Sequence, residues 1–441
     1  MASLLLRGGR VLDPANDIDK IADVLIVNGK IVSIESAISP SEVDDSRDVS
    51  GCLVVPGLID AHVHFRDPGL TYKEDLQTGA NSALAGGFVR VCCMPNTSPA
   101  LDSPERIRDI VERGRGTGIH IHPIGTITVG RLLEDIAPLA EMAEAGAIGF
   151  SDDGESTRSE ETMLEALRLA SALDRPIMVH CEDPALASGG VMNEGDVSAR
   201  LGLKGIPAAA EEDYIQRDIR LAEESGGWLH VLHVSTVKGA TAVREAKRRG
   251  SRVTAEVMPH HLLLTDEWVA GLRRFAGSSD PADDIGRTDP NAIVNPPLRP
   301  ESDALGLAEF VRDGTFDFIA TDHAPHAAQD KPSDLAKAAS GMLGLEVAIP
   351  TLAQVIRRGD LDWPIVIRKL TASVAETLNL PGGTLSQDAP ADVTIIDPER
   401  RWTITEEIIQ SKSKNTPLLG LEVQGRAVMT IVGGEILHDV L

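Results

Sequence analysis

The chain has 441 residues, of which 42% are apolar and 25% charged, a composition typical of a folded globular protein rather than a disordered one. It contains 42 basic and 67 acidic residues, and the net charge of −25 argues against partners such as nucleic acid or an anionic membrane. An anionic substrate therefore needs a local positive site. Apolar runs stay well below the roughly 20 residues of a membrane span, and the first residues do not have the pattern of a signal peptide.

The four cysteines also bear on the cellular compartment. Cys52, Cys92, Cys93 and Cys181 lie inside apolar, strand-like runs and do not have the spacing of a metal-binding finger. We expect them to be reduced residues of the core, which predicts a cytoplasmic protein.

The beginning of the chain is expected to form short β-strands joined by turns. In "IVNGKIV" (26–32), Asn-Gly separates two apolar runs, a strong signal for a hairpin with a two-residue turn. The pattern returns near the other end, where Gly-Gly stands in "IVGGEIL" (431–437). We therefore expect residues 1–56 and 380–441 to form one small β-sheet domain assembled from both termini.

Between these ends, residues 57–379 alternate between strand-like and helix-like segments. The predicted strands are 53–65, 88–94, 119–125, 147–151, 176–181, 228–234, 252–258 and 316–321, and predicted helices include 104–114, 160–173, 211–225 and 238–249. Eight strands with intervening helices predict an α/β fold, a TIM-like (β/α)8 barrel. A doubly wound open sheet is the alternative, but its glycine-rich phosphate-binding fingerprint does not follow the first strand.

The first barrel strand leads into "GLIDAHVHFRD" (57–67), where Asp60, His62, His64 and Arg66 alternate with apolar residues. Side chains of a strand alternate between its faces, so these four are expected to share one face. The preceding apolar run predicts burial on both sides of the strand. Buried charged and imidazole groups are costly unless something pairs with them, and a metal ion is the usual partner.

Polar residues also stand where the other predicted strands end, which is where a barrel places its chemistry. They are Asn96, Asp152, Asp153, His180, His233, Asp322, His323 and His326. One such histidine alone is more often a hydrogen-bonded core residue, but histidines and aspartates on four or five strand ends favour a metal site. Imidazole and carboxylate ligands suit zinc, and two metals need a carboxylate that bridges them about 3.5–4 Å apart.

The remaining histidines of the central segment carry less information. His120 and His122 repeat the HxH spacing early in a strand, and His230 lies in the middle of one, so we expect all three to be packing residues. His260 and His261 end the seventh strand, and the sequence leaves open whether they support the metal site.

The motifs "DAHVHFRDPG", "MPNT", "FSDDG", "HCED", "HVST", "EVMPHHLLLTDE", "NPPLR" and "ATDHAPH" occur in this order along the chain. Together they resemble the dihydroorotases of the bacterial type I class, within the amidohydrolase superfamily. The resemblance covers roughly residues 5 to 440, whereas HxH alone would indicate only the superfamily. The fold of that superfamily, a TIM-like barrel beside a small β-domain built from both termini, agrees with the architecture predicted above.

The resemblance implies a role for individual residues. The implied zinc ligands are His62, His64, Asp153, His180, His233 and Asp322. Asp153, rather than Asp152, would bridge two zinc ions, with one ion per subunit as the alternative, and Asp322 would be the catalytic acid and base. The implied substrate contacts are His64, Arg66, Asn96, Asn295, His326, Ser340 and Gly341. Asp60 is expected to orient a ligand histidine. One departure is that Ala339-Ser340-Gly341 stands where the family usually has a Pro-Phe-Gly segment.

The implied activity is the interconversion of N-carbamoyl-L-aspartate and L-dihydroorotate in pyrimidine biosynthesis, by a homodimer, with aspartate carbamoyltransferase as an optional partner. A hydantoinase or allantoinase is one alternative, but it should bridge its metals with a carboxylated lysine, and "AGAIGFSDDG" contains no lysine. A non-catalytic homologue that serves as a structural partner of the carbamoyltransferase is another, but it should have lost metal ligands, and all the expected ones are present.

Overall fold

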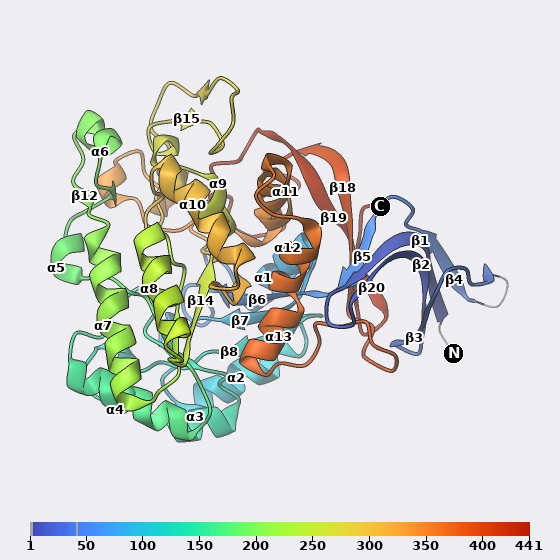
Figure 1. Ribbon diagram of the computed structural model, residues 1–441, viewed down its shortest axis with the longest axis horizontal. Helices are drawn as coiled ribbons and strands as arrows, with labels where there is room; N and C mark the ends of the chain where they lie inside the picture. Colours follow the sequence, from blue (N-terminus) through green and yellow to red (C-terminus); the bar gives the residue numbers. More distant parts are fainter. Residues whose placement is uncertain (1–2, 41–42) are drawn as a thin grey trace.

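The computed structural model describes residues 3–40 and 43–441; positions 1–2 and 41–42, which belong to the predicted N-terminal β segment, lie outside the described residues. A helix-covered barrel lies beside a sheet that contains both ends of the chain (Figure 1). Within the described part of the chain, no helix is both long enough and apolar enough to cross a membrane.

The sheet joins strands from the two termini. Its strands are β1 (Ser3–Asp13), β2 (Ile18–Val27), β3 (Lys30–Glu35), β4 (Asp45–Asp48), β5 (Leu53–Pro56), β18 (Val393–Thr403), β19 (Glu422–Val432) and β20 (Glu435–Asp439). β5 links the two halves, because it pairs with β1 on one side and with β18 on the other. Both predicted hairpins are present, and their turns touch: a side chain on Gly434 would lie 2.6 Å from the Cα of Gly29.

Eight short parallel strands form the barrel. They are β6 (Leu58–Val63), β7 (Phe88–Cys93), β8 (His120–Pro123), β9 (Phe150–Ser151), β10 (Ile177–Val179), β13 (Leu229–Val231), β14 (Val253–Val257) and β17 (Phe318–Ile319). Six ladders order them along the ring, and parallel bridges from Gly125 to Phe150 and from Val63 to His323 close it. The predicted (β/α)8 barrel is confirmed. The strand expected over 53–65 is in fact two strands, separated at Gly57: β5 belongs to the sheet and β6 to the barrel.

Helices follow the barrel strands and cover the outside. The longer ones are α1 (Leu76–Gly86), α2 (Pro104–Gly114), α3 (Leu139–Ala145), α4 (Glu160–Ala172), α7 (Ala209–Ser225), α8 (Val237–Arg248), α10 (Glu301–Arg312), α11 (Ala348–Arg358), α12 (Trp363–Leu370) and α13 (Ala372–Leu378). Short elements in the loops are α5 (Pro184–Ala187), α6 (Asp196–Leu201), α9 (Pro259–Leu263), β11 (Met192–Asn193), β12 (Gly205–Ile206), β15 (Leu272–Arg273) and β16 (Asp283–Asp284). The four predicted helices correspond to α2, α4, α7 and α8.

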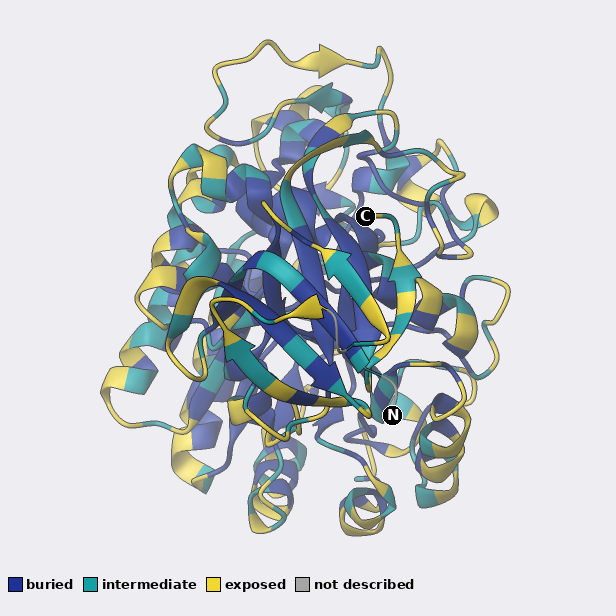
Figure 2. Cartoon of the chain, turned by 90° about the vertical axis from the view of Figure 1, so that its right-hand side faces the viewer, coloured by how far each residue is buried: buried dark blue, intermediate teal, exposed yellow. Residues whose placement is uncertain are grey.

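The apolar core extends across the boundary between barrel and sheet. One cluster combines barrel residues such as Val63 and Phe150 with Ile396 of β18 and Val423 of β19. A second cluster, which includes Leu6, Val24 and Val393, lies within the sheet. In Figure 2 the sheet strands nearest the barrel are buried, whereas the outermost strands and the outer faces of the helices are exposed. Barrel and sheet therefore share buried apolar surface.

Candidate functional site

The carboxyl ends of the barrel strands surround a cavity of about 290 Å³. Its lining residues are His64, Arg66, Asn96, Asp153, Gly154, His180, His233, Asn295, Asp322, Ala324, His326, Ser340 and Gly341. His62 is fully buried beside these residues. The structure thus brings together every residue that the sequence predicted as a ligand or a substrate contact, although the strands that carry them span more than 250 positions of the chain.

Two sets of three metal-binding side chains share one member. His62, His64 and Asp153 form the first set, and Asp153, His180 and His233 form the second; the potential ligand atoms within each set lie within 4.8 Å of one another. All five side chains are buried. A carboxylate shared between two sets of imidazoles is the arrangement that two bridged metal ions require.

In the first set, one imidazole nitrogen of His62 has no hydrogen-bond partner among the described residues. This atom, Nε2, is buried and faces Oδ2 of Asp153 at 3.8 Å and Oδ1 of Asp322 at 3.5 Å. Burial alone would lower the pKa of His62, but the carboxylates of Glu256 and Asp322 raise it well above its usual value. The site therefore favours a positive charge between the imidazole and the carboxylates, and a divalent cation fits this position.

The second set shows the same preference. Nδ1 of His180 and Nε2 of His233 lie 3.0 Å apart, and Oδ1 of Asp153 is 3.3 Å from the latter atom. Burial opposes ionisation of Asp153, yet its contacts with His233 and His62 lower its pKa well below the usual range. Two imidazole nitrogens and an ionised carboxylate that converge in this way can hold a metal ion.

Glu256 on β14 is a site residue that the sequence analysis missed. Its Oε1 lies 2.7 Å from Nδ1 of His62, and its Oε2 lies 3.3 Å from Nε2 of His230. Burial would raise the pKa of Glu256, but these two histidines, His62 foremost, lower it to about 2. The ionised carboxylate accepts the Nδ1 proton of His62, which leaves Nε2 free to bind a metal. The sequence feature that could have revealed Glu256 is its charge, which stands between apolar residues inside the strand predicted over 252–258.

The expectation that Asp60 orients a ligand histidine is met only at the backbone, where its carboxylate accepts a hydrogen bond from the N–H of His62 at 3.1 Å. The carboxylate of Asp60 accepts hydrogen bonds from the backbone N–H of Thr321 at 3.1 Å and from its hydroxyl at 2.5 Å. Pairing between β6 and β7 shifts register between Asp60 and Val63, so the strict alternation that would place Asp60 and the ligand histidines on one face is interrupted. Asp60 thus ties the backbone of β6 to the end of β17, whereas Glu256 orients the imidazole of His62.

Asn96 lines the cavity and bonds to potential metal ligands, whereas Asp152 bonds to a neighbouring loop. Oδ1 of Asn96 lies 2.8 Å from Nδ1 of His64, and its amide nitrogen lies 3.3 Å from Oδ2 of Asp153. Asn96 therefore holds two potential metal ligands as well as lining the cavity. The carboxylate of Asp152 instead accepts bonds from the backbone of Ile127 and from the hydroxyl of Thr128, which fix the loop after β8.

A positive group also lines the cavity. Arg66 is buried and forms no ion pair with a carboxylate among the described residues, and its Nε donates to the carbonyl of Pro325 at 3.3 Å. Burial lowers its pKa to about 10, so it remains a cation at neutral pH. One guanidinium nitrogen is 3.4 Å from Nε2 of His326. A buried cation without an ionic partner is costly, and an anionic ligand would remove that cost.

The wall beside His326 contains the segment that departs from the family pattern. The carbonyl of Ser340 lies 2.9 Å from Nε2 of His326. Asn415, from the C-terminal part of the chain, donates to the carbonyls of Ala324 and Gly341 and accepts from the N–H of His326. Ser340 and Gly341 line the cavity as predicted, and Asn415, which no sequence motif marked, holds that wall in place.

Several site residues have a backbone conformation that is rare without glycine. Arg66, His233 and Asp322 have φ values of 59°, 32° and 49°. Such residues are costly and cluster at functional sites, where the surrounding structure imposes them. Each of the three immediately follows or lies close to the end of a barrel strand, so the strained backbone turns its side chain into the cavity.

The other predicted histidines divide into two groups. His120 and His122 lie at the opposite end of the barrel, where Nε2 of His122 is 2.7 Å from Arg90 and Nε2 of His120 is 3.1 Å from Asp392. His260 and His261 are buried after β14; Nε2 of His261 donates to the carbonyl of Pro296, close to Asn295.

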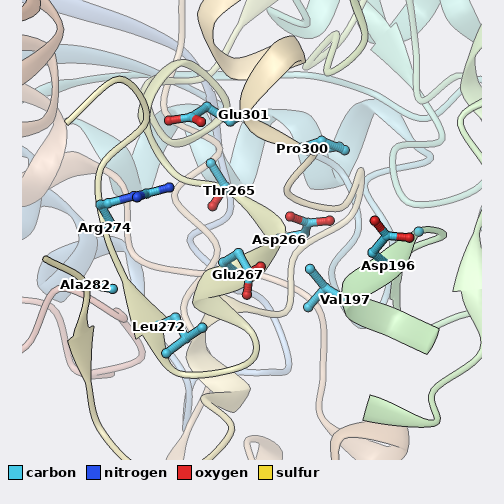
Figure 3. Close-up of a pocket in the computed structure, with 11 residues that line it drawn as sticks. Asp196, Val197, Thr265, Asp266, Glu267, Leu272, Arg274, Ala282, Pro300 and Glu301 are labelled. Carbon is cyan, nitrogen blue, oxygen red and sulfur yellow. The ribbon is translucent and has the colours of Figure 1, made fainter. Parts of the chain in front are cut away.

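A second cavity, of about 420 Å³, lies away from these residues (Figure 3). Asp196, Asp266, Glu267 and Glu301 dominate its polar lining, with Arg274 on one side. It contains no histidine, and its acidic lining would repel an anion. The smaller cavity is therefore the candidate site for metal-dependent chemistry on an anionic molecule.

Comparisons with known proteins agree with this geometry. A family described as Dihydro-orotase-like matches residues 51–239. The dihydroorotase of Geobacter sp. (strain M21) is 43% identical over 438 residues, and that of Syntrophotalea carbinolica is 44% identical over 436 residues; each alignment covers 99% of both chains.

Solved structures share the fold. The L-hydantoinase (dihydropyrimidinase) of Arthrobacter aurescens has a TM-score of 0.86 at 26% identity, covering 100% of this chain and 96% of that one. The dihydropyrimidinase of Brevibacillus agri NCHU1002, with a TM-score of 0.81 and 22% identity over 99% of this chain and 95% of that one, shows the fold alone.

Proposed function

The chain belongs to the dihydroorotase family of the amidohydrolase superfamily, and from this membership we propose that it interconverts N-carbamoyl-L-aspartate and L-dihydroorotate at the cavity described above. It is a metal-dependent cyclic amidohydrolase. The observation that carries the choice of substrate is the buried, unpaired guanidinium of Arg66 beside two sets of metal-binding side chains, because it calls for a substrate with a carboxylate next to a cyclic amide.

In this proposal the metals are two zinc ions. His62, His64 and Asp153 would hold one, and Asp153, His180 and His233 the other, with Asp322 beside the first; the single-ion alternative would use one of the two sets. The unpartnered Nε2 of His62 and the convergence of His180 and His233 on Asp153 support this assignment. Bound there, zinc would polarise the amide carbonyl and activate a water molecule.

The substrate would be oriented from the opposite side. Arg66 offers a planar pair of donors to the carboxylate, and the Nε2–H group of His326 lies close enough to share it. The side-chain oxygen of Asn295 is buried without a partner among the described residues, so it can accept a hydrogen bond from a ring N–H group. Ser340 and Gly341 would form the adjacent wall.

Asp322 would move the proton. In the hydrolytic direction its carboxylate accepts a proton from the attacking water while the bond between the ring nitrogen and the carbonyl carbon breaks. It then gives that proton to the leaving nitrogen. Cyclisation is the reverse: the carboxylate of Asp322 accepts the proton of the attacking nitrogen and gives it to the water that leaves. The contact of Oδ1 with Nε2 of His64 at 2.9 Å and the burial of the carboxylate support this role.

A hydantoinase activity is the second candidate, because the solved structures that share this fold include hydantoinases. Two observations weigh against it. The position that bridges the two sets is an aspartate rather than a lysine, and Arg66 would remain unpaired in a site that closed on a neutral ring. The proposed homodimer and the association with aspartate carbamoyltransferase rest on the family alone.

The direct test measures hydrolysis of L-dihydroorotate and of hydantoin by the zinc-loaded protein, together with its metal content. We expect turnover of dihydroorotate and little turnover of hydantoin. Efficient hydantoin hydrolysis with none of dihydroorotate would replace the proposal with the second candidate.

A further inference from the structure

Lys73 makes a contact at the edge of the site that none of the roles above explains. Its Nζ lies 3.1 Å from Nδ1 of His326 and 3.4 Å from Oδ2 of Asp330. Lys73 itself does not line the cavity. It therefore touches a residue of the proposed substrate site without reaching the space that a substrate would occupy.

The contact favours one of the two positions that the proton of His326 can occupy on its ring. An ammonium group can only donate, so Nδ1 must accept, and the proton of the neutral imidazole lies on Nε2. Nε2 has the carbonyl of Ser340 at 2.9 Å, to which it donates, and the guanidinium of Arg66 farther away at 3.4 Å. Burial, and then the charges of Arg66 and Lys73, lower the pKa of His326 to about 2, which keeps the ring neutral. With Nδ1 held as an acceptor, the ring presents a donor to the cavity.

The loop that carries Lys73 is fixed by other bonds. The carbonyl of Lys73 accepts a hydrogen bond from the hydroxyl of Ser413 at 2.7 Å. The neighbouring Glu74 is fully buried and accepts from the N–H of Lys412 at 3.2 Å and from the hydroxyl of Ser411. These bonds place the ammonium group before a substrate arrives, so its contact with His326 needs no rearrangement.

We propose that Lys73 is a positioning residue for the substrate carboxylate: it holds His326 in the form that donates from Nε2, so that His326 and Arg66 bind the carboxylate together. The proposal rests on the proposed function. Without Lys73, only the carbonyl of Ser340 would hold the proton on Nε2, so the ring would more often carry it on Nδ1 and turn the Nε2 lone pair towards the negative charge. That loss acts on substrate binding, and the metal-binding side chains are not involved.

The test compares Lys73→Met with the parent and with Lys73→Arg, which keeps a group that only donates. For Lys73→Met we expect KM for dihydroorotate to rise about tenfold, since a hydrogen bond to a charged group is lost, while kcat stays within about threefold. Lys73→Arg should recover most of the KM. Zinc content and thermal unfolding are measured in parallel, and Lys73→Gln supplies the same comparison if the methionine variant does not fold.

The control for the loss of one positive charge is Lys337→Met. Lys337 is exposed and pairs with Asp334 at 2.8 Å, so its removal should leave KM unchanged. A double-mutant cycle with His326→Asn tests the route of the effect, because Lys73→Met should add little once the imidazole is gone.

An unchanged KM in Lys73→Met, or an effect of equal size in the His326→Asn background, would overturn the inference while the parent remained an active dihydroorotase. Absence of dihydroorotate turnover by the zinc-loaded parent would instead overturn the proposed function.

Discussion

The positions of protons on imidazole rings decide much of the chemistry available to this site. Glu256 can only accept, so it places a proton on Nδ1 of His62 and leaves Nε2 for a metal. Lys73 can only donate, so it has the opposite effect on His326 and leaves Nε2 as a donor. The neighbour of each ring thus determines whether a histidine binds a cation or an anion, and neither neighbour belongs to the motif that contains the histidine.

The neighbouring aspartates after β9 give a matched pair of variants. Asp153→Ala should remove most bound zinc and nearly all activity, because Asp153 belongs to both sets of metal-binding side chains. Asp152→Ala should keep its zinc and lose stability by about 1–3 kcal/mol, since it leaves the donors at Ile127 and Thr128 unpaired. Metal analysis and urea unfolding of both variants check this. Greater zinc loss from Asp152→Ala would shift the bridging role by one residue.

A second pair of variants distinguishes the roles of two buried carboxylates. Glu256 lies beside the imidazole of His62, and Asp60 precedes that histidine by two positions in the sequence. Glu256→Gln should weaken zinc binding about 10–100-fold, because Nδ1 of His62 loses its charged partner. Asp60→Asn should leave zinc affinity near that of the parent, because Asp60 bonds to Thr321 and to the backbone of His62 rather than to an imidazole. Competition with a zinc-binding dye measures both affinities. Equal losses in the two variants would contradict the assignment of Glu256.

At the scale of elements, the site is assembled from the loops that follow the strands. β9, β10 and β17 have only two or three residues each, and the side chains that face the cavity come mostly after the strands end. The wall of the cavity at Ser340 and Gly341 is held by Asn415, which lies between β18 and β19. A loop from the sheet half of the chain therefore shapes a cavity of the barrel.

A substitution at Gly341 tests whether substrate binding depends on the exact position of this cavity wall. It has φ of 134°, and a Cβ there would lie 2.7 Å from Cβ of Ala324. Gly341→Ala should raise KM about tenfold by displacing the wall, an effect of roughly 1.4 kcal/mol on binding. Gly226→Ala is the control: its φ is also positive, at 68°, but a Cβ there meets open space. It should cost about 1 kcal/mol of stability with KM unchanged. Steady-state kinetics of the two variants gives the two KM values. An equal KM in both would contradict the prediction and show that the wall can move without loss of substrate binding.

At the scale of the whole molecule, buried polar contacts as well as apolar packing connect barrel and sheet. Glu346 precedes α11 and accepts from the hydroxyl of Ser82 on α1 at 2.8 Å. It also accepts from the backbone N–H groups of Gln410 and Ser411, both at 2.9 Å, between β18 and β19. Burial outweighs these bonds and raises the pKa of Glu346 to about 7.

This raised pKa predicts a pH dependence of stability. Between pH 4.5, the usual value, and about 7, the folded protein keeps a proton on Glu346 that the unfolded chain releases. Stability therefore falls as the pH rises through this window, by up to roughly 3 kcal/mol for this group. Glu346→Gln removes the contribution. Urea unfolding at pH 5 and pH 7.5 should show that the variant loses less stability between the two than the parent does; parallel losses would contradict the prediction.

The sequence by itself determined the class of fold, the order of the eight strands and the strand ends that supply the metal sets, while the resemblance to a family distinguished the individual ligands. These properties depend on local patterns: apolar runs of strand length, helical periodicity, glycine turns, and polar residues placed where strands end. Because parallel strands of a barrel end at one rim, placement at a strand end was enough to predict that His62, His180 and His233 would meet.

Only the tertiary structure decided the partners of these residues. Asp60 and Glu256 both stand in buried strands, and no local pattern shows which of them meets the imidazole of His62. In the folded chain the register shifts in β6, and Glu256 of β14 is the carboxylate that lies beside the ring. Lys73 and Asn415 are 253 and 89 positions away from His326, so no local pattern connects them. Local patterns determine which elements form, but contacts between distant elements depend on how all eight strands close into one ring.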